Sequence, residues 1–111
     1  MFRVEKPCGT GPYAEEEDHP MLAHMYLSHG DEDHPEPADD TLLNGIGADE
    51  VCGFPTLDAL EDWFAGYEDP LAELGYEIVI YSLPVSSVRY GHQQAVFVRD
   101  HAVPVKTWSL V

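Results

Sequence analysis

The sequence predicts a small α+β protein in which an antiparallel sheet is covered by one or two helices and a long acidic loop follows the first strand. Three observations favour this class. Strand-type segments stand at both ends of the chain, two helix-type segments stand between them, and a polar stretch separates the first strand from these helices. We expect the 111 residues to form one domain, residues 1–111, around a single core.

The N-terminal part begins with a predicted strand and continues into an acidic insertion. In MFRVEK, residues 1–6, apolar and polar residues alternate as in a half-buried strand. PCGTGPY then predicts a turn-rich loop. The insertion spans about 14–50 and is partly irregular. Within it, His19 and Pro20 are typical of the start of a short helix, and Gly30 is typical of its end.

Two further helices are predicted in the centre of the chain. In FPTLDALEDWFAGY, Thr56 is typical of an N-cap. The residues expected on the apolar side of this helix are Leu57, Leu60, Trp63 and Phe64. In EDPLAELGY, Asp69 predicts a second cap, Pro70 a first helical residue and Gly75 the end of the helix.

Three strands are predicted in the C-terminal third. They are YEIVIYSL (76–83), QAVFVR (94–99) and AVPVKTWSL (102–110), all rich in β-branched or aromatic residues. The sheet residues on which the first central helix is expected to pack are Ile78, Ile80, Val96 and Val103.

Charge is the most unusual property of the chain. The formal net charge is −16, from 21 acidic and five basic residues. Residues 7–88 contain neither Lys nor Arg, and all the acidic residues except Glu5 and Asp100 lie in this segment. Such a charge repels nucleic acids and anionic membranes, and it attracts a basic protein surface. The expected partner is therefore a protein with a basic surface.

The acidic insertion is the expected place of contact with this partner. We expect it to present a solvent-exposed acidic face, which is called the predicted acidic face below. Its residues are Glu15, Glu16, Glu17, Asp18, Asp31, Glu32, Asp33, Glu36, Asp39 and Asp40. Carboxylates on a rigid scaffold can approximate the charge density of duplex DNA, which suggests a nucleic-acid mimic or inhibitor. The alternative is that the acidity only keeps the protein soluble.

Four histidines in the insertion raise the question of a metal site. They are His19, His24, His29 and His34, each five residues after the last. Five residues advance a helix by about 140° beyond a full turn, and they alternate faces on a strand, so neither element brings these side chains to one ion. The ligand spacings of zinc and EF-hand calcium sites are also missing. The sequence therefore predicts no metal site.

Other functional signals are few. The chain contains no G-x-S-x-G, no P-loop and no CxxC pair, so we expect a binding protein rather than an enzyme, with no catalytic residues and no cofactor. It contains no apolar run of membrane-spanning length, and its N-terminus lacks the apolar region of a signal peptide. We therefore expect a cytoplasmic protein, located in the host cell if it is phage-encoded.

The order of several short blocks resembles a family of small uncharacterised proteins from actinobacteria and their phages. These blocks are FRVE followed by GTGPY, then CGFPTLDALEDWF, LGYEIVIYSLP and QQAVFVRDHAVPV. The resemblance covers the two ends and the centre of the chain and leaves out the acidic insertion. It implies a phage- or prophage-type accessory protein without an assigned activity, whose expected partner is a basic host or phage protein.

A second resemblance is to the ADP-ribosyltransferase-like fold. Arg3 matches the Arg or His of the first strand in that fold, Thr56 its Ser or Thr position and Gln94 the position of its catalytic Glu. This alternative implies an NAD-binding domain with a pocket lined by Arg3, Tyr13, Thr56 and Gln94. Gln94 keeps the hydrogen-bonding ability of Glu and loses its charge, so the domain would be degenerate.

Overall fold

The computed structural model describes residues 1–14, 17, 19–31 and 33–111. Within them the strands are β1 (Phe2–Glu5), β2 (Glu50–Gly53), β3 (Glu77–Ser82), β4 (Val88–Tyr90), β5 (Ala95–Val98) and β6 (Val103–Trp108). The α-helices are α1 (Ala23–Ser28), α2 (Leu57–Trp63) and α3 (Glu68–Glu73). The α+β class predicted from the sequence is confirmed. None of the described helices has the length and apolar composition needed to span a membrane.

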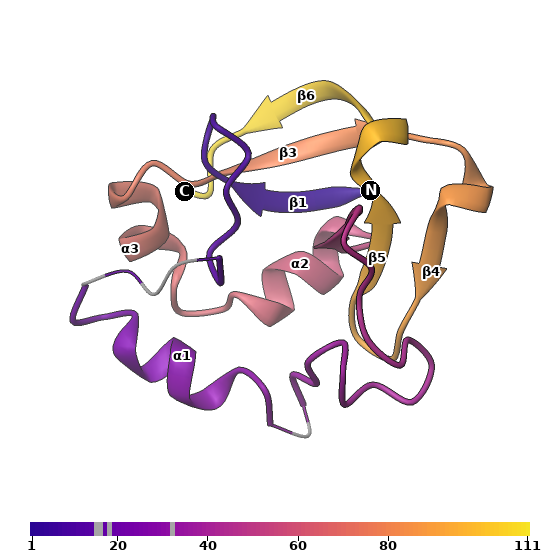
Figure 1. The fold of residues 1–111 in the computed structure, drawn as a ribbon. Helices are drawn as coiled ribbons and strands as arrows, with labels where there is room; N and C mark the ends of the chain where they lie inside the picture. The colour runs from indigo at the N-terminus through magenta and orange to yellow at the C-terminus, as the bar shows by residue number, and fades with distance from the viewer. Residues whose placement is uncertain (15–16, 18, 32) are drawn as a thin grey trace.

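The strands form two antiparallel three-stranded sheets instead of one. Their orders are β1-β3-β6 and β2-β5-β4. The sheets meet where Phe2 and Phe54 exchange two backbone hydrogen bonds, with N–O distances of 2.8 and 2.7 Å. Gly53 makes this approach possible, because a Cβ atom there would lie 3.0 Å from the Phe2 carbonyl oxygen. Figure 1 shows the two sheets side by side, with the helices below the first.

The main core lies between the helices and the first sheet. Leu60, Trp63 and Phe64 of the predicted apolar stripe are buried, and their cluster includes Ile78 of β3. The prediction is wrong for Val96, which is buried on β5 in the second sheet, and the cluster does not include Ile80. It is also wrong for Val103, because this residue is 61% exposed. Its strand, β6, pairs only with β3 at the edge of the sheet, so one side of the strand has no neighbouring strand among the described residues.

The helices begin and end close to the predicted residues. The Thr56 hydroxyl accepts a hydrogen bond from the Ala59 amide at 3.1 Å, which confirms the predicted cap of α2. Helix α3 begins two residues earlier than predicted, with Tyr67 at its N-cap position instead of Asp69. Gly75 follows its end with a φ of +91°, a conformation that favours glycine.

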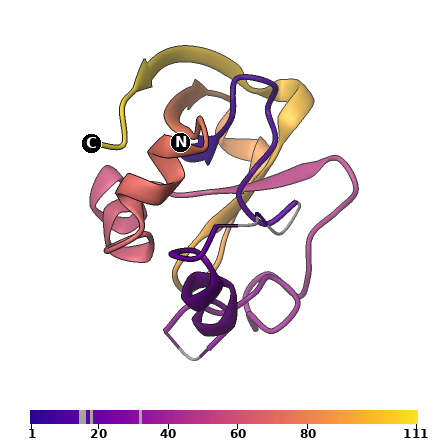
Figure 2. The same ribbon diagram turned by 90° about the vertical axis from the view of Figure 1, so that its left-hand side faces the viewer.

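Helix α1 is held to the rest of the molecule by two fully buried residues, Leu22 and Met25. It begins at Ala23, later than predicted, and His19 does not cap it. The His19 imidazole lies instead against the Glu73 carboxylate of α3, at 2.9 Å. Figure 2 shows α1 at the bottom of the molecule, beside the loop that continues the insertion toward β2.

Candidate binding surface

Asp40 is part of the predicted acidic face in the sequence but is buried in the structure. Its side chain anchors two loops, because its carboxylate accepts hydrogen bonds from the Leu42 amide at 2.9 Å and the His92 amide at 2.8 Å. Only 1% of the residue is exposed. These hydrogen bonds favour the charged form, and the pKa of Asp40 lies below its usual value although burial opposes that shift. Asp40 therefore belongs to the folded framework and not to an exposed face.

Two more residues of the predicted acidic face, Glu17 and Asp31, form hydrogen bonds or ion pairs with other residues of the protein. Glu17 pairs with Lys6 at 2.7 Å and accepts a hydrogen bond from the Tyr76 hydroxyl at 2.9 Å. Asp31 accepts hydrogen bonds from the backbone amides of the turn that follows it, and it contacts the His34 imidazole at 2.9 Å. Asp33, Glu36 and Asp39 are exposed. Glu15, Glu16, Asp18 and Glu32 lie outside the described residues.

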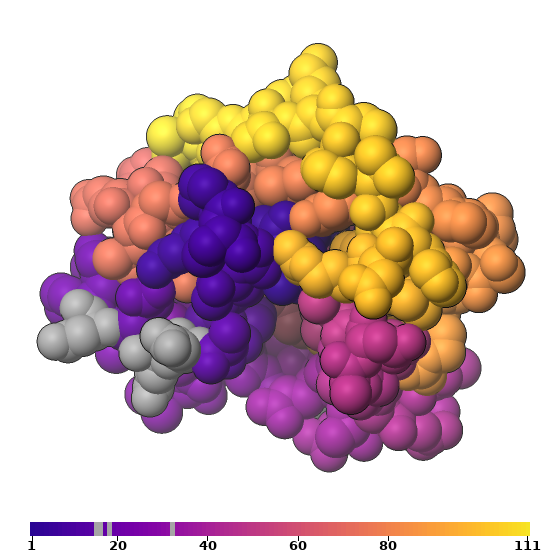
Figure 3. Space-filling view, turned by 45° about the horizontal axis from the view of Figure 1, so that its top comes forward, coloured from indigo at the N-terminus to yellow at the C-terminus, as the bar shows by residue number. Residues whose placement is uncertain are grey.

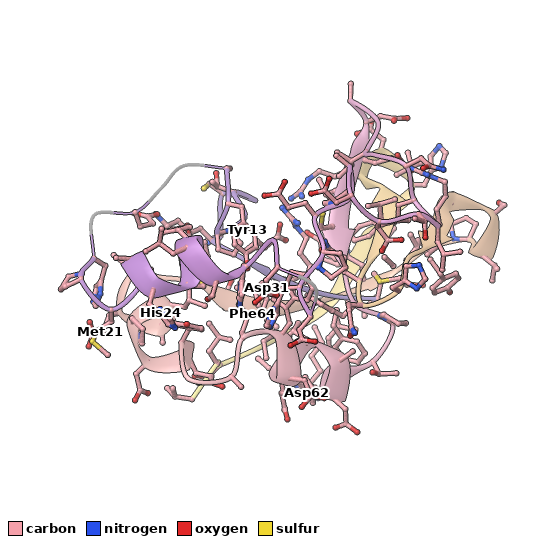
Figure 4. The ribbon with its side chains drawn as sticks, turned by 90° about the horizontal axis from the view of Figure 1, so that it is seen from below. Tyr13, Met21, His24, Asp31, Asp62 and Phe64 are labelled. Atoms are coloured by element: carbon pink, nitrogen blue, oxygen red, sulfur yellow. The ribbon has the colours of Figure 1, made fainter. Side chains whose placement is uncertain are left out.

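The structure adds two carboxylates from α2 to this acidic region. Asp58 and Asp62, one helical turn apart, line the same groove as Asp33 of the insertion. This groove, which we call the acidic groove, has a volume of about 480 Å³ and is also lined by Thr56, Trp63 and Gln93. In Figure 4, Asp62 projects from α2 toward solvent. The four-residue spacing in LDALED is a sequence signal that points to a shared face, and the contribution of Asp33 could be found only from the fold.

A second acidic hollow lies nearby. It has a volume of about 460 Å³, and we call it the loop groove. Its lining residues are Gly30, Asp31, Pro35, Asp39, Asp40, Thr41, His92 and Gln93. Because Gln93 also lines the acidic groove, the two hollows are neighbours.

The basic side chains that the structure places in ion pairs lie elsewhere. Arg3 and Arg99 both contact the buried carboxylate of Glu5, at 3.1 and 2.9 Å. Arg89 contacts Glu50 at 2.7 Å and also donates to the Leu43 carbonyl. Among the described residues that line the acidic groove and the loop groove there is no Lys or Arg. The carboxylates of these walls are therefore not neutralised by Lys or Arg, while Asp31 contacts the His34 imidazole at 2.9 Å and Asp40 lies 3.8 Å from the His92 imidazole.

A third hollow with a different character adjoins both grooves. It has a volume of about 570 Å³, and its walls are mostly apolar or aromatic. We call it the aromatic pocket; its lining includes Tyr13, His29, His34, Glu36, Ala38, Ile46, Cys52, Trp63 and Gln94, and Glu36 is the one carboxylate among its described lining residues. Figure 3 shows the surface hollowed between the N-terminal loop and the segment before β2. The lining of the aromatic pocket comes from six separate parts of the chain, from Tyr13 to Gln94.

One wall of the aromatic pocket is held by a chain of hydrogen bonds. The Trp63 indole donates to the Tyr13 hydroxyl at 2.9 Å, and that hydroxyl contacts Nδ1 of His29. The His29 ring also stacks on His34, with 4.4 Å between ring centroids. In Figure 4, Tyr13 and Phe64 lie near the centre of the view, where their rings stack.

Burial decides the charge of His29. Desolvation, assisted by the neighbouring His34, lowers its pKa to about 4. His29 is therefore neutral near pH 7, and its Nδ1 accepts the hydrogen bond of the Tyr13 hydroxyl. Desolvation also raises the pKa of Tyr13, which keeps the hydroxyl protonated. Tyr13 and His29 thus carry no charge at neutral pH.

The four histidines of the insertion do not share one environment. His19 contacts Glu73, and His24 lies beside Tyr67. His29 and His34 do come together, because His29 follows the end of α1 and the chain turns back before His34. Within the part of the chain that the structure describes, no three His, Cys, Asp or Glu side chains are arranged to hold a metal ion.

The four residues of the predicted ligand pocket lie in different places. Tyr13 and Gln94 both line the aromatic pocket. Thr56 caps α2 and lines the acidic groove. The Arg3 guanidinium donates to the Cys52 carbonyl at 2.7 Å and contacts Glu5. These four residues line no common hollow among those described, so we propose no function for the four together.

Fold and surface together describe a small acidic α+β protein of the kind that the first sequence resemblance implied, and comparison with known families supports a phage-type protein. A family model described as Bacteriophage T4 Y00F protein matches residues 1–111. The chain therefore belongs to this family. No curated protein matches the chain, and neither does any solved structure. The match does not address the ADP-ribosyltransferase resemblance.

Proposed function

We propose that this phage protein acts as an accessory protein that binds a basic protein surface through the acidic groove. The proposal rests on one observation. Asp33, Asp58 and Asp62 line the same groove, and the described walls of that groove contain no Lys or Arg that could neutralise them. Carboxylates held close together repel one another, and a cationic side chain placed among them removes that repulsion.

The size of the charge supports a protein partner over a nucleic acid. A net charge of −16 attracts a basic surface over about one Debye length and speeds its association at low salt. Surfaces of this kind are typical of proteins that bind nucleic-acid phosphates. The carboxylates of the groove would compete with those phosphates, so inhibition by mimicry of nucleic acid is the specific form of the function that we propose.

The test compares two triple variants that lose the same charge at different places. Asp33→Asn, Asp58→Asn and Asp62→Asn together remove the carboxylates of the acidic groove. Glu61→Gln, Asp69→Asn and Asp100→Asn remove three exposed carboxylates that line neither the acidic groove nor the loop groove. Each protein is immobilised and used to capture partners from a lysate of the host bacterium.

The groove variant is expected to lose a basic partner that the wild type and the control variant both retain. Captured protein should also be released as salt rises, because the attraction is electrostatic. Equal loss from both variants would show that only total charge matters and that the groove is not the binding site. Circular dichroism of each variant shows whether it is folded.

A further inference from the structure

We propose that the aromatic pocket receives an aromatic or large aliphatic side chain of the basic partner, while flanking Lys or Arg residues of that partner lie in the acidic groove and the loop groove. This inference rests on the proposed function and specifies it. The partner segment would be a basic peptide with an apolar anchor residue in its centre.

The positions of the three hollows support this arrangement. His34 and Trp63 line both the aromatic pocket and the acidic groove. Gly30 lines both the aromatic pocket and the loop groove. The carboxylates of both grooves therefore lie next to an apolar hollow. An apolar anchor site surrounded by a polar rim is the usual anatomy of a protein interface.

The lining of the pocket favours an apolar occupant. Tyr13 and Ile46 are 46% and 47% exposed, so they present large apolar surfaces to solvent. His29, which forms part of the wall, is neutral at pH 7, as described above. An anionic ligand would be repelled by the net charge of −16, whereas an apolar side chain on a basic peptide is drawn to the same surface.

The pocket is also preorganised to bind. Tyr13 is fixed by its hydrogen bonds to Trp63 and His29. Trp63 is only 6% exposed and packs against Phe54, with 5.6 Å between ring centroids. A wall that is already ordered loses little conformational entropy on binding, which favours affinity. The volume of about 570 Å³ lies within the usual range of ligand pockets.

Two peptides distinguish the contribution of the apolar anchor to affinity from that of the basic charge. The probes are acetyl-KRKWKRK-amide and the same peptide with Ala in place of Trp. Their charges are equal, so the salt dependence of binding should be the same. The Trp peptide is expected to bind the full chain about tenfold more tightly or better, and this ratio should persist as salt rises.

Cys52 provides a direct readout of pocket occupancy. It lines the aromatic pocket, and the other cysteine, Cys8, is exposed. In a Cys8→Ser variant, only Cys52 can react with N-ethylmaleimide. Saturating Trp peptide is expected to slow this reaction at least severalfold, whereas saturating Ala peptide should leave it nearly unchanged. Free N-acetyltryptophanamide at the same concentration should give no protection.

A pair of variants tests the same point by filling the pocket. Ala38 is exposed and lines the pocket, so Ala38→Phe should abolish the preference for the Trp peptide and leave the affinity for the Ala peptide unchanged. Ala48→Phe, at an exposed position outside the pocket lining, should preserve the preference. If Ala38→Phe fails to fold, protection of Cys52 in the Cys8→Ser protein still decides the question.

The possible failures can be told apart. Equal affinity for the two peptides without protection of Cys52 would overturn the anchor pocket and leave the proposed function intact. If the Asp33, Asp58 and Asp62 amide variant binds the Ala peptide no more weakly than the control triple variant does, the proposed function and this inference both fail. Protection by N-acetyltryptophanamide alone would assign the pocket to a small aromatic ligand and overturn the peptide assignment.

Discussion

Glu5 is a buried carboxylate that pairs with two of the few basic side chains of the protein. It is 3% exposed, and its carboxylate contacts both Arg3 and Arg99. The Tyr81 hydroxyl also donates to it, and this contact helps to raise the pKa of Tyr81 to about 12, after the larger effect of burial. One carboxylate thus joins β1 to β3 and to the turn after β5.

We predict that Glu5→Gln lowers the free energy of unfolding by about 3–5 kcal/mol, because two guanidinium groups lose their buried counter-charge. Urea denaturation measures the change. Glu77→Gln is the matched control, since Glu77 lies opposite Glu5 on β3 and is only half-buried. A loss for Glu5→Gln no larger than that of the control would mean that the pair of arginines does not depend on this charge.

A second prediction for a single residue concerns the protonation of His29. Its pKa is about 4 in the folded protein and near 6.5 when unfolded. Between these values the unfolded chain binds a proton that the folded protein does not. The contribution of His29 to the free energy of unfolding is therefore fully present above pH 6.5 and is lost as pH falls toward 4.

We expect this effect to cost the wild type about 1 kcal/mol between pH 7 and 5, allowing for partial solvent screening. His29→Asn retains an acceptor for the Tyr13 hydroxyl and lacks the titration. The other groups that face His29, namely His34, Asp31 and His24, are the same in both proteins. Urea denaturation at the two pH values should therefore show a smaller decrease for the variant, and identical decreases would contradict the assignment.

Helix α2 connects the core to the binding surface. Its buried residues Leu60 and Trp63 face the first sheet, while Asp58 and Asp62 line the acidic groove. Trp63 contributes to both sides, because it also forms part of the aromatic pocket. The position of this one short helix thus decides whether the proposed surface exists.

We predict that Trp63→Ala costs about 3–5 kcal/mol, enough to unfold a domain of this size. The expected result is loss of the cooperative thermal transition seen by circular dichroism. Trp108→Ala is a suitable comparison, because Trp108 is a partly buried residue at the margin of the same cluster, on an edge strand. A stable Trp63→Ala protein would show that α2 is held mainly by other contacts.

At the scale of the whole molecule, repulsion between like charges lowers the stability of the folded state. The chain carries −16 formal charges, and many of its carboxylates are exposed. Added salt screens the repulsion between them. We therefore expect the melting temperature to rise as sodium chloride is increased from low to moderate concentration.

Two adjacent aspartates distinguish general charge repulsion from the specific structural role of a single carboxylate. Asp39→Asn removes an exposed charge and should leave the melting temperature unchanged or raise it at low salt. Asp40→Asn alters the buried anchor of two loops and should cost about 1–3 kcal/mol at any salt concentration. Similar effects of the two substitutions, measured by thermal denaturation, would refute the distinction between them.

The sequence by itself determined the features that depend on neighbouring residues. The cap at Thr56, the stripe of Leu60, Trp63 and Phe64, and the three C-terminal strands follow from local spacing and propensity, and the structure has each of them. The surplus of acidic charge is likewise a property of composition.

Only the tertiary structure decided which of these residues meet. Strands β2 and β4 are short and depend on pairing with β5, so local patterns did not reveal them. The burial of Asp40 and the exposure of Val103 depend on loops and strands far away in sequence. The aromatic pocket brings Tyr13 to Trp63 across 50 residues. Contacts at such distances are set by the packing of whole elements, whose arrangement local spacing does not encode.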